Sequence, residues 1–78
     1  MKYRILNILD KSIGGYLEQN VFEIDNNLNF FDIGLDSLGF VNLIVALERE
    51  FNMTICQEDL KLENFSSINR IILFLEDK

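Results

Sequence analysis

The strongest constraint on the fold of this chain is a set of apolar stripes that repeat with the period of an α-helix. Three segments carry such a stripe, near residues 5–17, 38–51 and 68–75. No segment alternates polar and apolar residues as a half-buried β-strand does, and the chain contains no proline. The sequence therefore predicts an all-α fold.

The first stripe predicts a helix over residues 2–17. Gly14 and Gly15 lie within it, and each glycine costs about 1 kcal/mol in a helix interior. Because the apolar period continues to Tyr16 and Leu17, we expect the helix to continue past the glycines with fraying or a bend.

The later helices follow from their end signals. Ser37–Phe51 is predicted as the second helix, with Asn52 as a left-handed stop. One short helical turn is expected over residues 57–62, and Ser66 or Ser67 is expected to cap the last helix. The predicted architecture is a small four-helix bundle of three main helices and one short helix, within a single domain covering residues 1–78.

A long ordered loop is predicted between the first two helices. Residues 19–36 have no sustained period and are rich in Asn and Asp, with a turn at residues 25–27. Gly34 suits the backbone conformation that leads the chain into the next helix. The apolar residues expected to hold the loop against the core are Phe22, Ile24, Leu28, Phe30, Phe31 and Ile33.

Composition narrows the possible partners and the compartment. The net charge of −6 disfavours nucleic acid and anionic membranes as partners and favours partners with basic patches. No signal peptide and no apolar run of membrane-spanning length is visible, so a cytoplasmic location is expected. The single cysteine, Cys56, cannot form an internal disulfide and is expected to be a small core residue.

The helix over residues 37–51 has two apolar faces. Its core stripe comprises Phe40, Leu43, Ile44, Leu47 and Phe51. Leu38, Val41 and Val45 lie on the opposite side, which a small bundle has little material to cover. We expect this second stripe to be a partner-binding face, with Asn42 and Arg49 on it and Glu48 at its margin.

Ser37 lies where a loop enters this helix. A hydroxyl there is close to unpaired backbone N–H groups and to the positive end of the helix dipole, which suits a phosphate joined to its oxygen. Serine is also common at this position as a simple helix cap. Position alone leaves both interpretations open.

The surrounding residues resemble a known family. Gly34-Leu35-Asp36-Ser37-Leu38 is similar to the attachment motif of acyl and peptidyl carrier proteins. The resemblance includes the Phe30–Ile33 segment before the motif and continues through the helix pattern of residues 41–51 to Asp59-Leu60 and residues 64–68. It covers essentially the whole chain from residue 22 onward.

The resemblance implies a function in tethering. A phosphopantetheinyl transferase would attach 4′-phosphopantetheine to Ser37, with Asp36 and Leu38 helping the transferase to recognise the serine. The arm would hold an acyl or aminoacyl group as a thioester and present it to biosynthetic enzymes. The implied partners are an acyl- or amino-acid-activating ligase and downstream synthases or transferases, which a monomeric carrier would meet in turn.

Three positions depart from the fatty-acid type of the family. That type usually has acids where this chain has Gly39, Asn42 and Arg49. The sequence is more similar to specialised peptidyl or D-alanyl carriers, so docking is expected to depend more on apolar contacts than on charge. Small or polar cargo is expected to stay outside the bundle.

Two other classes of function compare less well with this sequence, an enzyme and a helical adaptor. The chain has no histidine, no Gly-rich phosphate loop and no metal-ligand spacing, so we do not expect it to be an enzyme or to bind a metal. The alternative to a carrier is a non-catalytic helical adaptor in which Ser37 stays unmodified.

Overall fold

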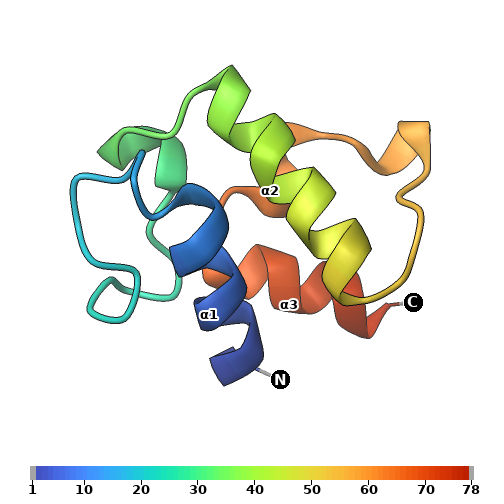
Figure 1. The fold of residues 1–78 in the computed structure, drawn as a ribbon, viewed down its shortest axis with the longest axis horizontal. Helices are drawn as coiled ribbons and strands as arrows, with labels where there is room; N and C mark the ends of the chain where they lie inside the picture. Colours follow the sequence, from blue (N-terminus) through green and yellow to red (C-terminus); the bar gives the residue numbers. More distant parts are fainter. Residues whose placement is uncertain (1, 78) are drawn as a thin grey trace.

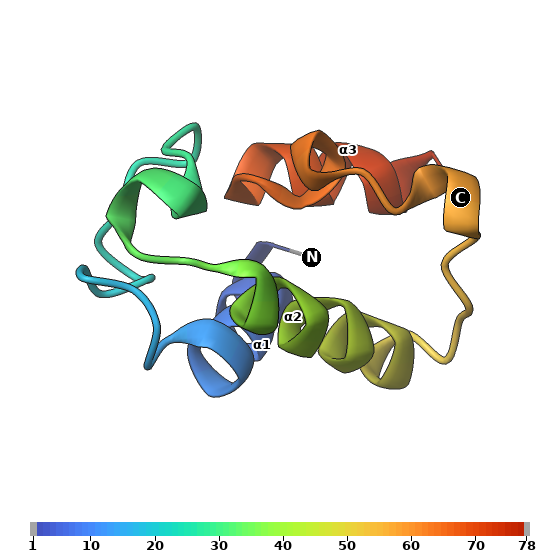
Figure 2. The ribbon, with the colours of Figure 1, turned by 90° about the horizontal axis from the view of Figure 1, so that it is seen from above.

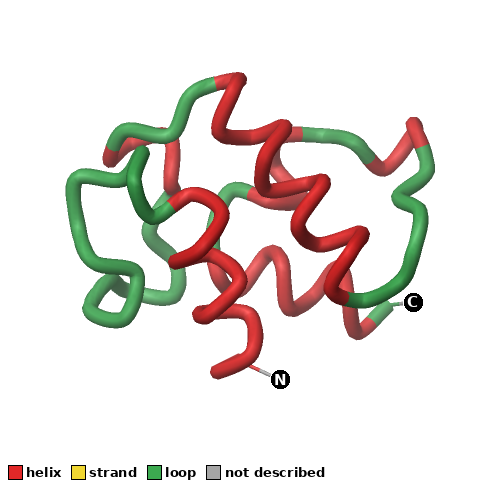
Figure 3. The backbone as a smooth tube through the Cα atoms, in the orientation of Figure 1, coloured by secondary structure: helices red, strands yellow, loops and turns green. Residues whose placement is uncertain are grey.

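Helical segments form all the regular structure in residues 2–77, the part of the chain that the computed structural model describes (Figures 1 and 3). Within this range no β-strand is present, which confirms the predicted all-α class. The α-helices are α1 (Lys2–Ile13), α2 (Ser37–Glu50) and α3 (Ile68–Glu76), and the 3-10 helices are η1 (Phe30–Ile33), η2 (Gln57–Asp59) and η3 (Leu62–Phe65).

The helices are arranged in two layers around one apolar core. α1 and α2 pack side by side, and α3 with η3 lies across them (Figure 2). The completely buried side chains come from all three α-helices and from two 3-10 segments: Ile5, Leu9, Ile13, Phe30, Leu43, Leu47, Phe65 and Ile71. The helical stripes predicted from the sequence therefore meet in this core.

The first helix is shorter than predicted. α1 ends at Ile13, and residues 14–16 form a turn in which the Tyr16 N–H donates to the Ile13 carbonyl at 2.9 Å. The two glycines end the helix because their lack of side chains makes continued helix costly. Tyr16 and Leu17 still pack against the core, which explains why the apolar period continues beyond the helix.

The segment between α1 and α2 contains η1, so the predicted long ordered loop is corrected to a series of turns and one 3-10 helix. Its core contacts are largely as predicted, because Ile24, Phe30 and Ile33 are buried. Phe22 was wrongly predicted as a core contact. It is 44% exposed and lies against the Tyr3 ring, while the preceding Val21 takes the inward position.

Backbone hydrogen bonds hold this segment in place, including one from the Asn69 N–H on α3 to the Asn26 carbonyl at 3.0 Å. Glu18 N–H donates to the Ile33 carbonyl and Phe30 N–H donates to the Ser66 carbonyl, both at 2.7 Å. The predicted turn at residues 25–27 is present, with the Asn27 N–H donating to Asp25 Oδ1 at 2.8 Å. The segment is therefore ordered by specific bonds as well as by apolar contacts.

The predicted short helical turn over residues 57–62 is present only in part, as a 3-10 turn. Residues 57–59 and 62–65 form two separate 3-10 turns, with bonds from Asp59 N–H to the Cys56 carbonyl and from Leu60 N–H to the Gln57 carbonyl. Each of these bonds spans three residues, so no α-helical turn forms. The four-helix bundle is therefore corrected to three α-helices joined by 3-10 segments.

The prediction that Cys56 is a core residue is also wrong, because its side chain is exposed. The backbone is extended at Cys56, with φ −64° and ψ 145°. Successive side chains point to opposite sides in an extended segment, and Ile55 takes the inward direction.

The predicted cap and stop signals of the later helices are confirmed, although α2 ends at Glu50, one residue before the predicted Phe51. Ser67 caps α3 by accepting a hydrogen bond from the Arg70 N–H at 3.2 Å. Asn52 has φ 49° directly after the C-cap of α2, the left-handed conformation predicted for it. Along residues 2–77 no helix is long and apolar enough to cross a membrane.

The exposed start of helix α2

The approach to α2 depends on a left-handed glycine. Gly34 ends η1 with φ 116°, and a side chain there would collide with the Tyr16 carbonyl oxygen. Leu35 then turns into the core, and Asp36 is extended. The chain therefore reaches α2 with Asp36 and Ser37 on the outside.

Asp36 is the cap of α2. Its Oδ1 accepts a hydrogen bond from the Gly39 N–H at 2.9 Å, and its carbonyl accepts one from the Phe40 N–H. Ser37 is the first helical residue, so the interpretation of Ser37 as a cap is wrong. Because an acidic cap satisfies the N–H of Gly39, the serine hydroxyl has no capping task.

The Ser37 side chain is exposed to solvent. The N–H groups of Ser37 and Leu38 donate to no acceptor among residues 2–77. These donors, together with the helix dipole, favour negative charge beside the serine oxygen. The negative charge of the exposed Asp36 carboxylate opposes this effect, since Asp36 caps the same helix start and its Oδ1 accepts the Gly39 N–H.

The first turn of α2 packs closely on its inner side. A methyl group added at Gly39 would lie 2.5 Å from Leu35 Cδ1 and 3.2 Å from the Tyr16 ring. The Tyr16 hydroxyl also accepts a hydrogen bond from Asn42 Nδ2 at 2.9 Å. These contacts fix the start of α2 against the turn that follows α1, so Ser37 is presented from a rigid base.

The outer face of α2 is exposed as the sequence predicted. Leu38, Val41 and Val45 are 64%, 55% and 40% exposed. Their spacing places them along one side of the helix, and Asn42 and Arg49 are exposed as well. We call the line formed by Leu38, Val41 and Val45 the outer stripe. This apolar stripe lies beside the exposed hydroxyl, so it can contact a partner protein that acts on that hydroxyl.

Glu48, predicted at the margin of this face, makes a hydrogen bond within the fold. It is only partly exposed, and its Oε2 accepts a hydrogen bond from the Ile55 N–H at 2.9 Å. The carboxylate therefore holds the segment after α2 against the helix. No local sequence pattern indicates this bond, because the two residues lie on either side of the turn at Asn52.

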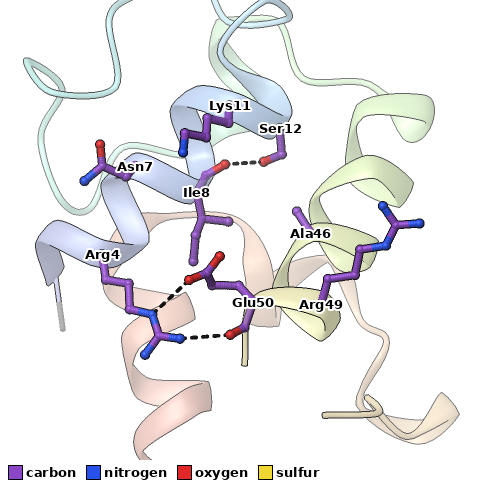
Figure 4. A pocket seen from close by; sticks show the side chains of 8 residues that line it. All are labelled: Arg4, Asn7, Ile8, Lys11, Ser12, Ala46, Arg49 and Glu50. Carbon is purple, nitrogen blue, oxygen red and sulfur yellow. Dashed lines mark hydrogen bonds and ion pairs between the residues drawn. The ribbon is translucent and has the colours of Figure 1, made fainter. Parts of the chain in front are cut away.

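The structure also contains a pocket of about 480 Å³ at the far end of α2, between α1 and α2 (Figure 4). Sequence reasoning missed it, because its residues come from two helices far apart in the chain. They are Arg4, Asn7, Ile8, Lys11, Ser12, Ala46, Arg49 and Glu50. Ser37 is not among them, so the pocket is separate from the exposed serine. In residues 2–77 no three His, Cys, Asp or Glu side chains gather as metal ligands would.

Four phenylalanine rings form a row from η1 to α3. The ring centroids of Phe31 and Phe40 are 6.2 Å apart, those of Phe40 and Phe65 are 6.0 Å apart, and those of Phe65 and Phe74 are 4.9 Å apart. Such tilted and edge-on pairs stabilise each other beyond their burial alone. We call these four rings the aromatic row.

Comparison with known proteins places this site in context. A family model described as "Phosphopantetheine attachment site" matches residues 7–75. The chain is 36% identical over 69 residues to aminoacyl carrier protein 1 of Bradyrhizobium diazoefficiens, covering 86% of this chain and 77% of the relative. It is 38% identical over 73 residues to the D-alanyl carrier protein of Streptococcus suis, covering 92% of this chain and 86% of the relative. Other relatives are named acyl carrier protein.

The fold is similar to that of a carrier protein solved with its ligase. The match is to a crystal structure of an engineered Bradyrhizobium japonicum glycine:[carrier protein] ligase complexed with a carrier protein from Agrobacterium tumefaciens and ATP. The TM-score is 0.89 at 26% identity, and the match covers 99% of this chain and 97% of the other.

Proposed function

The chain belongs to the phosphopantetheine-attachment family of carrier proteins, and on that premise we propose that Ser37 is the residue that carries the prosthetic group. The cofactor of this family is covalently attached 4′-phosphopantetheine. In our proposal the Ser37 oxygen is joined to its phosphate as a phosphodiester. The group then supplies a thiol that holds an acyl or aminoacyl cargo as a thioester.

The residues around Ser37 suit a phosphodiester. The hydroxyl is exposed, and the Ser37 and Leu38 N–H groups are available as donors to phosphate oxygens. The inner contacts of Gly39 keep the helix start in place while the outer side stays open. This exposed hydroxyl beside two free donors is the observation on which the proposal mainly depends.

The chain's own contribution is presentation, and we assign no bond-making step to it. Asp36 and Leu38 flank the serine and are proposed to guide the phosphopantetheinyl transferase. The outer stripe, with Asn42, Glu48 and Arg49, is proposed as the surface for an activating ligase and for downstream synthases or transferases. A similar carrier protein was crystallised with a glycine:[carrier protein] ligase, which supports an amino-acid-activating ligase as one partner.

We propose that the cargo is small, such as an aminoacyl group, and stays outside the fold. The aromatic row supports this, because a long chain entering between α2 and α3 would have to displace packed rings. NMR spectra of the loaded protein should show shifts confined to residues near Ser37. Shifts across Phe40, Phe65 and Phe74 would contradict external cargo.

Intact mass spectrometry tests the attachment. The protein is incubated with coenzyme A and a broad-specificity phosphopantetheinyl transferase. The mass should increase by one phosphopantetheine group, and the increase should vanish in Ser37→Ala. Ser66→Ala is the matched control, because Ser66 is only partly buried and bonds locally to the Glu63 carbonyl.

The same measurement separates the carrier from the adaptor. An adaptor with an unmodified serine predicts no mass increase in the natural chain. An increase that persists in Ser37→Ala would also contradict our assignment, since it would place the group on another residue.

A further inference from the structure

The lining of the pocket between α1 and α2 is more basic than the chain as a whole. Its lining includes three bases, Arg4, Lys11 and Arg49, against one acid, Glu50. The whole chain has the opposite balance, with seven bases against thirteen acids. A basic pocket on an acidic protein attracts negatively charged groups locally.

Two of the three cations are free to bind a partner. Arg4 is occupied, because its Nε lies 3.2 Å from Glu50 Oε2, its Nη2 donates to the Glu50 carbonyl at 2.8 Å and its guanidinium lies over the Phe51 ring. The Lys11 and Arg49 side chains are exposed and make no hydrogen bond or ion pair with any residue in 2–77. The pocket therefore offers two uncompensated positive charges beside one fixed ion pair.

The two free cations do not converge on one point. Lys11 extends from α1 and Arg49 from α2 on opposite sides of the pocket, with Ile8 and Ala46 between them (Figure 4). An occupant that matches this arrangement has carboxylates on both sides of an apolar contact.

We propose that this pocket docks an acidic, amphipathic segment of a partner protein, with an apolar side chain against Ile8 and Ala46 and carboxylates beside Lys11 and Arg49. The pocket lies away from the serine, since Arg49 is twelve residues beyond Ser37 on α2, or about 18 Å along the helix axis. A partner held there leaves Ser37 accessible. This pocket adds a second docking place, which shares Arg49 with the surface proposed around the outer stripe.

The proposal can be tested on the unmodified protein, so its failure and the failure of attachment at Ser37 are distinguishable. The probe is a short synthetic helical peptide with one leucine flanked by glutamates. Backbone amide NMR shifts during titration should gather at Asn7, Lys11, Ala46 and Arg49. Raising the salt to about 1 M, where the Debye length is about 3 Å, should weaken the binding strongly.

Substitutions test which positive charges contribute to peptide binding. Lys11→Gln and Arg49→Gln should each weaken peptide binding about threefold, and together about tenfold. Lys61→Gln is the matched control, because Lys61 is exposed and lies outside the pocket, and it should leave the binding unchanged. Circular dichroism confirms that each variant is folded, and either single variant suffices if the other unfolds.

Several outcomes would overturn the proposal. One is equal binding of a peptide in which the glutamates are glutamines. Another is the same set of shifts with inorganic phosphate, which would make the pocket a small-anion site. Shifts that depend on protein concentration alone would assign the surface to a second copy of this chain. Absence of shifts in the pocket would contradict docking altogether.

Discussion

The two faces of α2 differ in what their side chains contact. On the inner face Leu43 and Leu47 are completely buried. On the outer face Leu38 and Val41 have similar apolar chemistry and are more than half exposed. The inner face of α2 therefore stabilises the fold, while the outer face is available for recognition. Substitutions on the two faces should affect different measurements.

The largest expected effect is on stability, from the inner face. Leu47→Ala should lower the free energy of unfolding by about 3 kcal/mol, because it removes buried methyl groups and leaves a cavity. Val41→Ala should change it by less than about 0.5 kcal/mol. Urea denaturation followed by circular dichroism measures both. Equal losses would show that the outer face also belongs to the core.

The next effect is on recognition, from the outer face. Val41→Asp should lower kcat/KM for modification by the phosphopantetheinyl transferase about tenfold, because it places a charge in an apolar contact. The protein should remain folded, since the position is 55% exposed.

Leu73→Asp is the control for this substitution. Leu73 is 58% exposed, but it lies on α3 rather than on the outer stripe. The transferase should modify this variant at the same rate as the unsubstituted protein. If the two aspartates slow the reaction equally, the outer stripe has no special part in docking.

The smallest expected effect is on stability, from substitution of Asp36, the N-cap of α2. Asp36→Ala should cost about 1 kcal/mol of stability, because the Gly39 N–H loses its capping acceptor. Asp36→Asn should cost less than about 0.5 kcal/mol, since asparagine keeps a capping oxygen. Thermal and urea unfolding of the two variants would measure the difference. Equal stabilities would contradict the capping role.

Local patterns predicted much of this molecule. The second helix, its left-handed stop at Asn52 and its exposed outer stripe all follow from the period of about fifteen neighbouring residues. The exposed position of Ser37 follows from the adjoining loop. These features depend on residues close together in the chain, which is why the sequence alone could indicate them.

The missed features depend on contacts between distant residues or on small energy differences. The Arg4–Glu50 pair joins positions 46 residues apart, and the basic pocket exists only where α1 and α2 meet. The free-energy difference between an α-helical turn and 3-10 turns at residues 57–62 is small, so tertiary packing decides which one forms. The exposure of Cys56 likewise depends on which of two adjacent residues faces the core.

The attachment residue can be identified by fragmenting a peptide of the modified protein. Trypsin cleaves after Lys11 and Arg49 and releases residues 12–49, which contain Ser12 and Ser37. Tandem mass spectrometry should assign the added phosphopantetheine to Ser37 and find Ser12 unmodified, since the Ser12 hydroxyl is partly buried and donates to the Ile8 carbonyl. Fragments that place the group on Ser12, or on any peptide outside residues 12–49, would contradict the account.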